Sequence, residues 1–385
     1  MAKNIAVGID IGTASVKVMV AEREKGEETP RVLGFGSALS QGIRRGCVVD
    51  AEDVSEAIIA AAKDAEKASG ISVKNAYVSL CGMSLGSMRQ KGMVMVSRAD
   101  SEITEHDVRR AVEMSQAQLP SLANKSIVHT DPLYFVVDHD TVSHNPIGLV
   151  GGKLEVETLF TTGAAQYMQN LVKSMEAAGI AVDDIVAAPF AESVSVLSKR
   201  QKEAGVALVN IGAGTTSIIV YEEGVPLSLE VFPVGSEHIT RDIAIGFQLP
   251  MDAAEAMKCN SASESGNKTR LANIIEARLS DIFELVDKHL KKMGRQKLLP
   301  AGVVITGGGA NLADIAEFAK QELKLPAEVG TVQNIQSNYS KIQDPKWSVV
   351  AGLCLYGLEK ESGYSSYFMK GAGGAAARWL RSFLP

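Results

Sequence analysis

The chain has 385 residues, of which 46% are hydrophobic and 22% charged, and its formal net charge is −6. These values are typical of a globular protein with two or more domains, and they exclude the strongly basic surface of a general nucleic-acid-binding protein. No run approaches the roughly 20 apolar residues of a membrane span, and the four cysteines form no C-x-x-C pair, which favours free thiols over disulfides or a zinc site.

The first predicted element is a β-hairpin near the N-terminus. An apolar run over 5–11 predicts a buried strand, Gly12 and Thr13 predict a tight turn, and the alternation over 16–20 predicts a returning strand. Because glycine has no Cβ, the N–H groups of such a turn can approach an anion. Asp10 would face that anion, and an acid beside a polyphosphate usually holds Mg²⁺ through water. Taken alone, an ordinary glycine turn explains the pattern better.

The next segments complete a β-β-β-α-β order. A strand is predicted over 31–36 and a loop over 41–49. The following helix is capped by Asp50 and ends at Gly70, and a further strand covers 76–80.

Over residues 84–161 several short segments replace the regular apolar alternation of the preceding strands, which predicts an inserted small α+β subdomain. A helix begins at Thr104, and strands are predicted over 127–138 and 153–161. Isolated histidines are more often surface or core groups than metal ligands. The segment contains three of them: His129, His139 and His144.

The link to the second half contains a helix over 164–178, a strand over 184–188 and a helix that starts at Pro189. The charged segment 199–205 is predicted to be a flexible hinge between two lobes.

The second half repeats the plan of the first. Strands are predicted over 206–211, 217–221 and 227–234, and the segment from Val209 to Thr216 is again a strand followed by a glycine turn and hydroxyl residues. Two such hairpins in the two halves of one chain indicate a duplicated fold that closes on one nucleotide.

Two helices are predicted after the second set of strands. A short helix, Met251 to Lys258, places Glu255 and Lys258 on one face. The pair is either a solvent-facing ion pair, worth about 0.2–0.5 kcal/mol, or a contact to ribose and adenine. In the long amphipathic helix over 270–293, Arg278 is predicted to point to the cleft.

A third glycine run, Gly307 to Gly309, follows the apolar strand 302–305 and is predicted to open a helix at Asn311, as a nucleoside-binding loop would. A strand over 327–330 and a core helix over 347–358 follow.

The C-terminal end combines a linker over 361–374 with a terminal helix over 375–385. Such a short helix is unstable in water, but at a bilayer its apolar face would be buried and its arginines would meet anionic headgroups. Docking on the protein's own domain is the alternative, and the glycine-rich tether favours the membrane. The predicted membrane residues are Arg378, Trp379, Leu380, Arg381, Phe383 and Leu384.

Two phosphate hairpins followed by a T-G-G-G loop resemble the actin, Hsp70 and sugar-kinase superfamily. Within it, the chain is similar to the bacterial cell-division family FtsA. The resemblance rests on His129 to Phe135, on the NPIGLVG stretch at Asn145 to Gly151, on Gly235 to Ile243 and on the basic amphipathic tail.

The resemblance implies an α/β fold of the actin-like (ribonuclease H-like) kind, a duplicated two-lobe ATPase fold with an inserted small α+β subdomain and a C-terminal amphipathic helix. The expected ranges are 1–83 and 162–198 for the first lobe, 84–161 for the inserted subdomain, 199–235 and 301–360 for the second lobe core, 236–300 for its small subdomain, 361–374 for the linker and 375–385 for the membrane helix.

The resemblance also implies ATP and Mg²⁺ as cofactors, with Asp10 at the metal and no assigned catalytic residue. The residues expected at the nucleotide are Asp10, Gly12, Thr13 and Lys17 in the first hairpin, Asn210, Gly212, Gly214, Thr215 and Thr216 in the second, Glu255 and Lys258 at the nucleoside, and Gly307, Gly308 and Gly309 in the adenosine loop.

The partners implied by the resemblance are the C-terminal peptide of FtsZ, docked on 236–300, further copies of the chain in filaments, an anionic lipid bilayer and other division proteins, with no nucleic acid. The implied location is the cytoplasmic side of the cytoplasmic (inner) membrane, peripherally bound at the division site, where the protein would polymerise, tether FtsZ and help recruit later division proteins.

One departure from the family pattern concerns hydrolysis. The second hairpin of the family usually starts with Asp, and here it starts with Asn210. An amide can orient water but cannot act as a base, so we expect binding of ATP with weak or absent hydrolysis. The alternatives are a PilM-type scaffold of pilus assembly, and a kinase or phosphatase, for which we find no acidic base.

Overall fold

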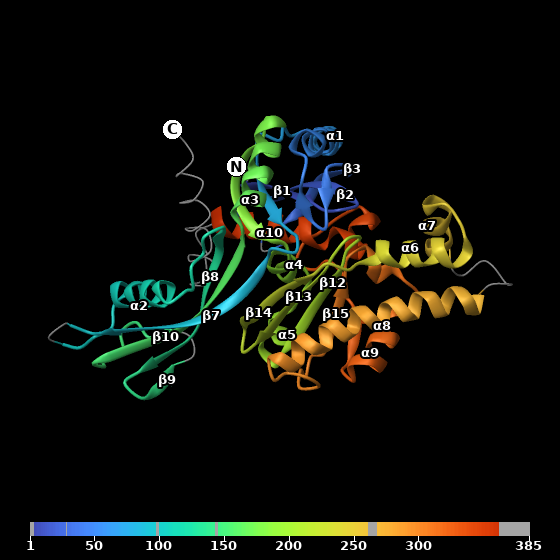
Figure 1. Ribbon diagram of the computed structural model, residues 1–385. Helices are drawn as coiled ribbons and strands as arrows, with labels where there is room; N and C mark the ends of the chain where they lie inside the picture. The colour runs from blue at the N-terminus through green and yellow to red at the C-terminus, as the bar shows by residue number, and fades with distance from the viewer. Residues whose placement is uncertain (1–3, 28, 98–99, 143–144, 261–267, 362–385) are drawn as a thin grey trace.

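The computed structural model describes residues 4–27, 29–97, 100–142, 145–260 and 268–361 (Figure 1). None of the helices in these ranges has the length and apolar content needed to cross a bilayer. The predicted linker beyond Glu361 and the predicted membrane helix lie outside the described residues, as does the polar loop 261–267.

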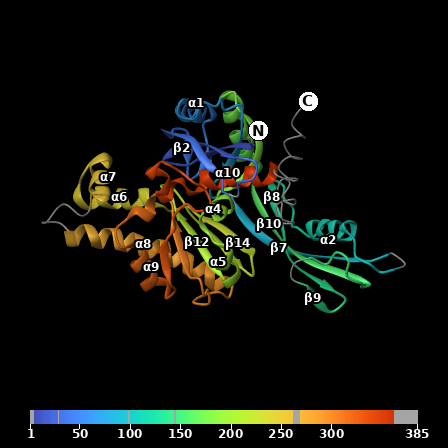
Figure 2. The same cartoon turned by 180° about the vertical axis from the view of Figure 1, so that it is seen from behind.

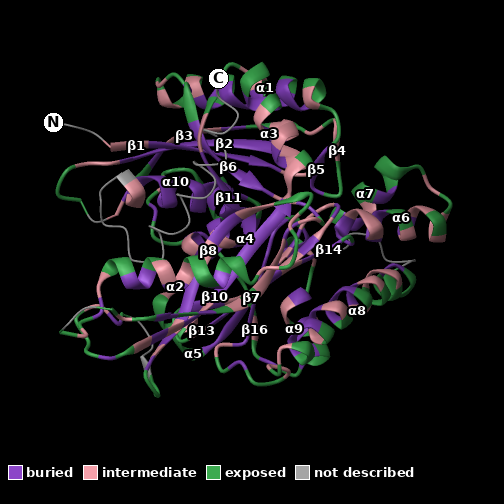
Figure 3. Cartoon of the chain, turned by 60° about the vertical axis from the view of Figure 1, so that its left-hand side comes forward, coloured by how far each residue is buried: buried purple, intermediate pink, exposed green. Residues whose placement is uncertain are grey.

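The first lobe is a five-stranded sheet in the order β11-β6-β1-β2-β3. Helices α1 and α3 pack on one face and α10 on the other, so its central strands are apolar on both faces and buried (Figure 3). The elements are β1 (Asn4–Ile11), β2 (Ser15–Arg23), β3 (Arg31–Leu39), α1 (Ala51–Ser69), β6 (Asn75–Leu80), α3 (Ala165–Ala177), β11 (Ala181–Ala187) and α10 (Ser348–Glu361).

The second lobe repeats this topology in the order β16-β15-β12-β13-β14. In each lobe the first two strands along the chain are antiparallel, and the first strand pairs in parallel with a later one, β6 or β15. The predicted duplication is therefore confirmed. The elements are β12 (Val206–Ile211), β13 (Thr216–Glu222), β14 (Val225–Phe232), α6 (Ser236–Phe247), α7 (Met251–Cys259), α8 (Lys268–Lys292), β15 (Val303–Thr306), α9 (Ile315–Leu323) and β16 (Ala327–Val329).

The segment between β6 and α3 forms an antiparallel sheet in the order β7-β10-β8-β9, with α2 packed on it. Strand β7 also pairs with β14 through Gly86 and Glu230, so this sheet continues that of the second lobe. It extends away from α6 and α7 in both views (Figures 1 and 2). The elements are β7 (Gly86–Met95), α2 (Glu105–Ala117), β8 (Lys125–Val137), β9 (Asp140–Val142) and β10 (Lys153–Ala164).

Two predicted loops are ordered elements instead. The segment 199–205, predicted to be a flexible hinge, contains helix α5 (Lys199–Ala204), because the Ser198 hydroxyl accepts from the Gln201 N–H at 3.2 Å and caps it. The loop 41–49 contains a short hairpin of β4 (Ile43–Arg44) and β5 (Cys47–Val48). Asp50 and Gly70 cap α1 as predicted.

Helix α4 (Ala188–Val196) links the lobes and packs closely against α10. The contact is close because α10 has a glycine at the crossing point. A Cβ on Gly352 would lie 2.5 Å from the carbonyl carbon of Ala191, and closer still to its oxygen.

Two titratable side chains of β8 are buried, and one of them contacts α4. His129 stacks on Phe190 with 4.8 Å between ring centroids, and its Nε2 accepts from the Ala187 N–H at 2.8 Å. Burial lowers the pKa of His129 to about 3. Asp131 is also buried, and none of the described residues donates a hydrogen bond to its Oδ1. Burial raises the pKa of Asp131 to about 7.

Asp131→Asn is expected to change the pH dependence of stability. Because the pKa of Asp131 is higher in the folded protein than in the unfolded chain, its carboxyl increasingly destabilises the fold as the pH rises from about 4 to about 7. Asparagine cannot ionise, so the variant should gain a few kcal/mol relative to the wild type over this range, at about 1.4 kcal/mol per pKa unit. Urea unfolding of both proteins between pH 4 and pH 8 measures the effect, and a difference independent of pH would contradict it.

Candidate nucleotide-binding site

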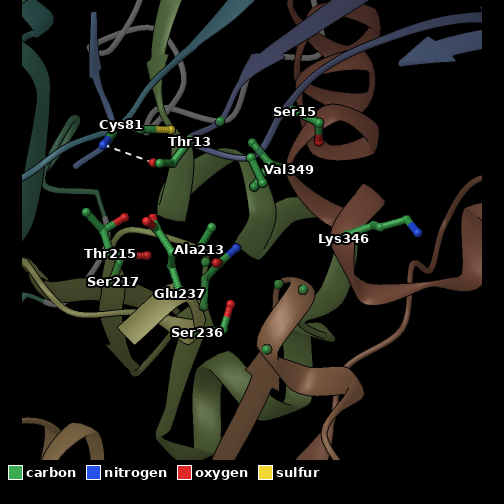
Figure 4. Close-up of a pocket in the computed structure, with 18 of the residues that line it drawn as sticks. Thr13, Ser15, Cys81, Ala213, Thr215, Ser217, Ser236, Glu237, Lys346 and Val349 are labelled. Atoms are coloured by element: carbon green, nitrogen blue, oxygen red, sulfur yellow. Dashed lines mark hydrogen bonds between the residues drawn. The ribbon is translucent and has the colours of Figure 1, made fainter. Parts of the chain in front are cut away.

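A cleft of about 600 Å³ lies where the two lobes meet, which is a suitable size for a nucleotide. Both hairpin turns, α7, the third glycine run and the start of α10 line it. In Figure 4, Thr13 from the first hairpin and Thr215 from the second reach the same space from opposite sides. The cleft thus contains the three glycine-bearing segments predicted to bind a nucleotide.

The two hairpin turns have the same hydrogen bonding. The Gly12 N–H donates to the Ser15 carbonyl at 3.2 Å, and the Gly212 N–H donates to the Thr215 carbonyl at 2.9 Å. Asp10 pairs with Lys17 across the first hairpin, just as Asn210 pairs with Ser217 across the second. Asp10 and Asn210 therefore occupy equivalent positions in the two lobes.

Asp10 is buried at the base of the cleft and held from two sides. Its Oδ1 accepts from the Ser79 hydroxyl at 2.9 Å, and its Oδ2 forms an ion pair with Lys17 Nζ at 3.2 Å. The Ser79 hydroxyl in turn accepts from the Ile11 N–H at 3.1 Å. A hard oxygen donor, fixed beside turns that can bind phosphate, fits Mg²⁺ held through water.

Asn210 is held from behind by a residue that the sequence reasoning missed. Its Nδ2 donates at 2.8 Å to Oε1 of Glu192, which is fully buried in α4 and also bonded to the Ser348 hydroxyl. Burial raises the pKa of Glu192 to about 7, although hydrogen bonds from Ser348, Thr306 and Asn210 oppose the shift. One signal could have identified it, because Glu192 is the only charged residue in the otherwise apolar and hydroxyl-rich helix 188–196.

The two α7 residues predicted at the nucleoside line the cleft together. Lys258 is buried, and its Nζ donates to Glu255 Oε2 at 2.8 Å and to the Thr240 hydroxyl at 2.9 Å. Burial opposes ionisation of Glu255, but the hydrogen bonds from Lys258 and Thr240 outweigh it and lower the pKa of this carboxyl. The pair is therefore a fixed part of the cleft wall, with Glu255 half exposed.

The third glycine run follows β15 and packs against the second hairpin. Gly307 has φ of 79°, and a Cβ there would lie 2.5 Å from Asn210 Oδ1. The prediction that this run opens an α-helix at Asn311 is wrong. A 3₁₀ turn over Gly308–Asn311 follows, and α9 begins only at Ile315.

Three further predicted residues do not line the cleft. Thr216 is buried, and its hydroxyl donates to the Val234 carbonyl at 2.8 Å, so it is not directed at the cleft. Gly214 lies within the second turn and faces the first lobe, where a Cβ would come within 3.1 Å of the Thr13 hydroxyl. Arg278 instead pairs with Asp242 at 2.7 Å and Asp281 at 2.8 Å.

The remaining predicted residues all line the cleft: Asp10, Gly12, Thr13, Lys17, Asn210, Gly212, Thr215, Glu255, Lys258, Gly307, Gly308 and Gly309. The cleft also contains polar residues that were not predicted: Ser15, Ser40, Cys81, Ser217, Ser236, Glu237, Asn311 and Lys346.

A duplicated five-stranded topology closing on one cleft defines the class of actin-like proteins, and comparison with solved structures agrees. A chain of a PilM–PilN type IV pilus biogenesis complex matches with a TM-score of 0.71 and 18% identity, covering 92% of this chain and 98% of that one. MreB5 of Spiroplasma citri, solved bound to AMPPNP, matches with a TM-score of 0.53 and 13% identity. The match covers 94% of this chain and 98% of the MreB5 chain. The predicted actin-like α/β fold class is confirmed for the described residues, and the C-terminal helix that was part of the prediction lies outside them.

Sequence comparisons identify the particular family. The family model "Cell division protein FtsA" matches residues 207–352, and the model "SHS2 domain inserted in FTSA" matches residues 82–162. FtsA of Borreliella burgdorferi is 32% identical over 94% of this chain and 92% of its own length. FtsA of Bacillus subtilis is 34% identical over 90% of this chain and 82% of its own length. The chain belongs to the FtsA family of cell division proteins.

Proposed function

We propose that this cell division protein binds ATP with Mg²⁺ in the cleft and polymerises on the cytoplasmic face of the membrane at the division site. There it would tether FtsZ filaments and help recruit later division proteins. The observation that carries the nucleotide assignment is the pair of identically closed glycine turns, which line one cleft with Asp10 between Ser79 and Lys17. The solved structure of MreB5 with AMPPNP supports it, because that protein shares the fold.

In this proposal each group has a distinct task. The backbone N–H groups of the two turns bind the phosphates, as glycine turns do with anions. Asp10 orients the water shell of Mg²⁺, which neutralises phosphate charge when bound. Glu255 and Lys258, already joined at 2.8 Å, form the wall beside ribose and adenine.

Hydrolysis of ATP would be weak or absent. The carboxylate that could orient a water as a base is missing from the second hairpin, where Asn210 stands. The nearby Glu192 carboxyl is fully buried and is not among the residues that line the cleft. An amide can hold a water but cannot accept its proton.

Partner binding in this proposal uses three other parts of the chain. The FtsZ C-terminal peptide would dock on the small subdomain 236–300, and the inserted segment would contribute to filament contacts. The apolar face and arginines of residues 375–385 would attach each subunit to anionic lipid. A single short anchor binds weakly, but many anchors on one filament bind strongly through avidity.

Removing the tail is expected to abolish membrane binding. The full chain should sediment with vesicles that contain anionic lipid, and a chain ending at Lys370 should stay in the supernatant. The double variant Arg378→Ala/Arg381→Ala keeps the apolar face and should bind roughly 30-fold more weakly, at about 1 kcal/mol per basic residue.

Neutral vesicles are the lipid control for this experiment, since they should bind the full chain much less. If the full chain does not sediment at any protein concentration, with ATP present, the tail is not an anchor and the proposed membrane attachment is wrong. If binding is found, an assay with the FtsZ C-terminal peptide tests the tether.

A further inference from the structure

The amide of Asn210 has two chemically different ends, and its orientation decides what it presents to the cleft. The oxygen accepts hydrogen bonds, and the nitrogen only donates them. The equivalent residue in the first lobe, Asp10, has two acceptor oxygens, so its orientation has no such consequence. The neighbours of Asn210 are therefore part of the site's chemistry.

The amide nitrogen is directed away from the cleft. It donates to Glu192 Oε1 at 2.8 Å, on the side of α4. The amide oxygen lies on the opposite side, toward the glycines that line the cleft. A Cβ on Gly307 would be 2.5 Å from this oxygen, and a Cβ on Gly212 would be 3.8 Å from it.

Glu192 is itself fixed by a third element. Ser348, at the start of α10, makes a hydrogen bond to the same Oε1 and contacts the Pro345 carbonyl at 2.6 Å. Ser195 holds the backbone of Ser348, because its hydroxyl donates to the Ser348 carbonyl at 2.6 Å. Both Glu192 and Ser348 are fully buried, so solvent does not compete for these bonds.

We propose that Glu192 is a positioning residue of the nucleotide site, which locks the Asn210 amide so that its oxygen faces the phosphates and the Mg²⁺-bound water of ATP. The inference rests on the proposed function. The second hairpin has Asn210 where the family usually has an aspartate. In this chain the nearby carboxyl is that of Glu192 on α4, which is hydrogen-bonded to the Asn210 amide. Oε1 can accept from Asn210 in both the ionised and the neutral carboxyl, because a proton on Oε2 leaves Oε1 free.

The first test replaces Glu192 in the full-length chain and measures ATP affinity by calorimetry, once with Mg²⁺ and once with EDTA. Glu192→Leu removes the acceptor, so affinity with Mg²⁺ should fall about tenfold, as when outer-shell partners of metal sites are lost. Glu192→Gln still offers an oxygen to Asn210 and should stay within about threefold of the wild type. Affinity in EDTA should change little in either variant.

Asp184→Asn is the control, because it also removes the ionisable carboxyl of a buried acidic residue. Asp184 lies on β11, bonded to Tyr356 at 3.1 Å and Lys360 at 2.7 Å, and does not line the cleft. Its loss should leave the dependence of ATP affinity on Mg²⁺ unchanged. Equal losses in Glu192→Leu and Asp184→Asn would overturn the proposal.

The second test exchanges the hydrogen-bond donor and acceptor between positions 210 and 192. Asn210→Asp alone places two carboxyls in contact, which then compete for one proton, so both the melting temperature and the Mg²⁺–ATP affinity should fall. In the double variant Asn210→Asp/Glu192→Gln, the amide introduced on α4 can donate to the carboxylate introduced on β12, and both quantities should recover to at least the wild-type values. If the losses in the double variant equal the sum of the losses in the two single variants, the proposal is overturned.

The two tests separate the inference from the proposed function. If the wild-type chain binds no ATP, the proposed function is wrong, and with it any nucleotide role of Glu192. If the wild type binds ATP but Glu192→Leu, folded by circular dichroism, keeps the full Mg²⁺ dependence, only the role of Glu192 is wrong. If Glu192→Leu does not fold, the double variant Asn210→Asp/Glu192→Gln tests the role of Glu192 instead, since it keeps one carboxyl and one amide at these two positions.

Discussion

Asp10→Asn is expected to lower the Mg²⁺-dependent affinity for ATP by about 100-fold, the upper end of the range for residues that orient metal-bound groups. The substitution preserves the shape of the side chain and the hydrogen bond from Ser79. It removes the negative charge that would hold the water shell of Mg²⁺ and leaves Lys17 without its ion-pair partner. Calorimetric titration with ATP, with and without Mg²⁺, measures the effect.

The control for Asp10→Asn is Asp53→Asn, which removes one negative charge from an exposed position of α1 outside the cleft. It should bind ATP like the wild type. In EDTA the difference between Asp10→Asn and the wild type should largely disappear, because the carboxylate then has no metal to orient. An equally large loss in EDTA would show that Asp10 acts through the fold of the hairpin.

Gly352→Ala is expected to destabilise the protein by about 3 kcal/mol, the upper end of the usual range for overpacking. The new methyl group would collide with the Ala191 backbone of α4, which cannot move aside as a flexible side chain could. The loss would exceed the helix-propensity gain of about 1 kcal/mol for replacing glycine by alanine. Thermal unfolding followed by circular dichroism measures the change.

Gly86→Ala is the matched control, because Gly86 has ordinary backbone geometry and a Cβ there would meet nothing within 4 Å. Its unfolding midpoint should stay close to that of the wild type. A midpoint for Gly352→Ala equal to that of Gly86→Ala would mean that α4 and α10 can separate without cost.

Local sequence patterns predicted elements correctly at positions where a single short-range interaction controls the backbone. The Asp50 and Gly70 caps of α1 and the two glycine turns at Gly12 and Gly212 are of this kind. One error occurred where polar composition was taken for flexibility. Residues 199–205 contain many charges, yet the Ser198 cap stabilises α5 there. A different error concerns Thr216, which the resemblance placed at the nucleotide, because its hydroxyl bonds to a backbone carbonyl of its own sheet region.

The sequence by itself determined the duplicated plan, the three glycine segments and the acid at Asp10, because periodicity and turn chemistry act over a few residues. Only the tertiary structure decided which distant residues meet. Strand β7 extends the sheet of the second lobe at Glu230, and Glu192 contacts Asn210 and Ser348, the latter 156 residues away. Apolar alternation specifies that a strand face is buried but not which element covers it, so such pairings depend on packing of the whole chain.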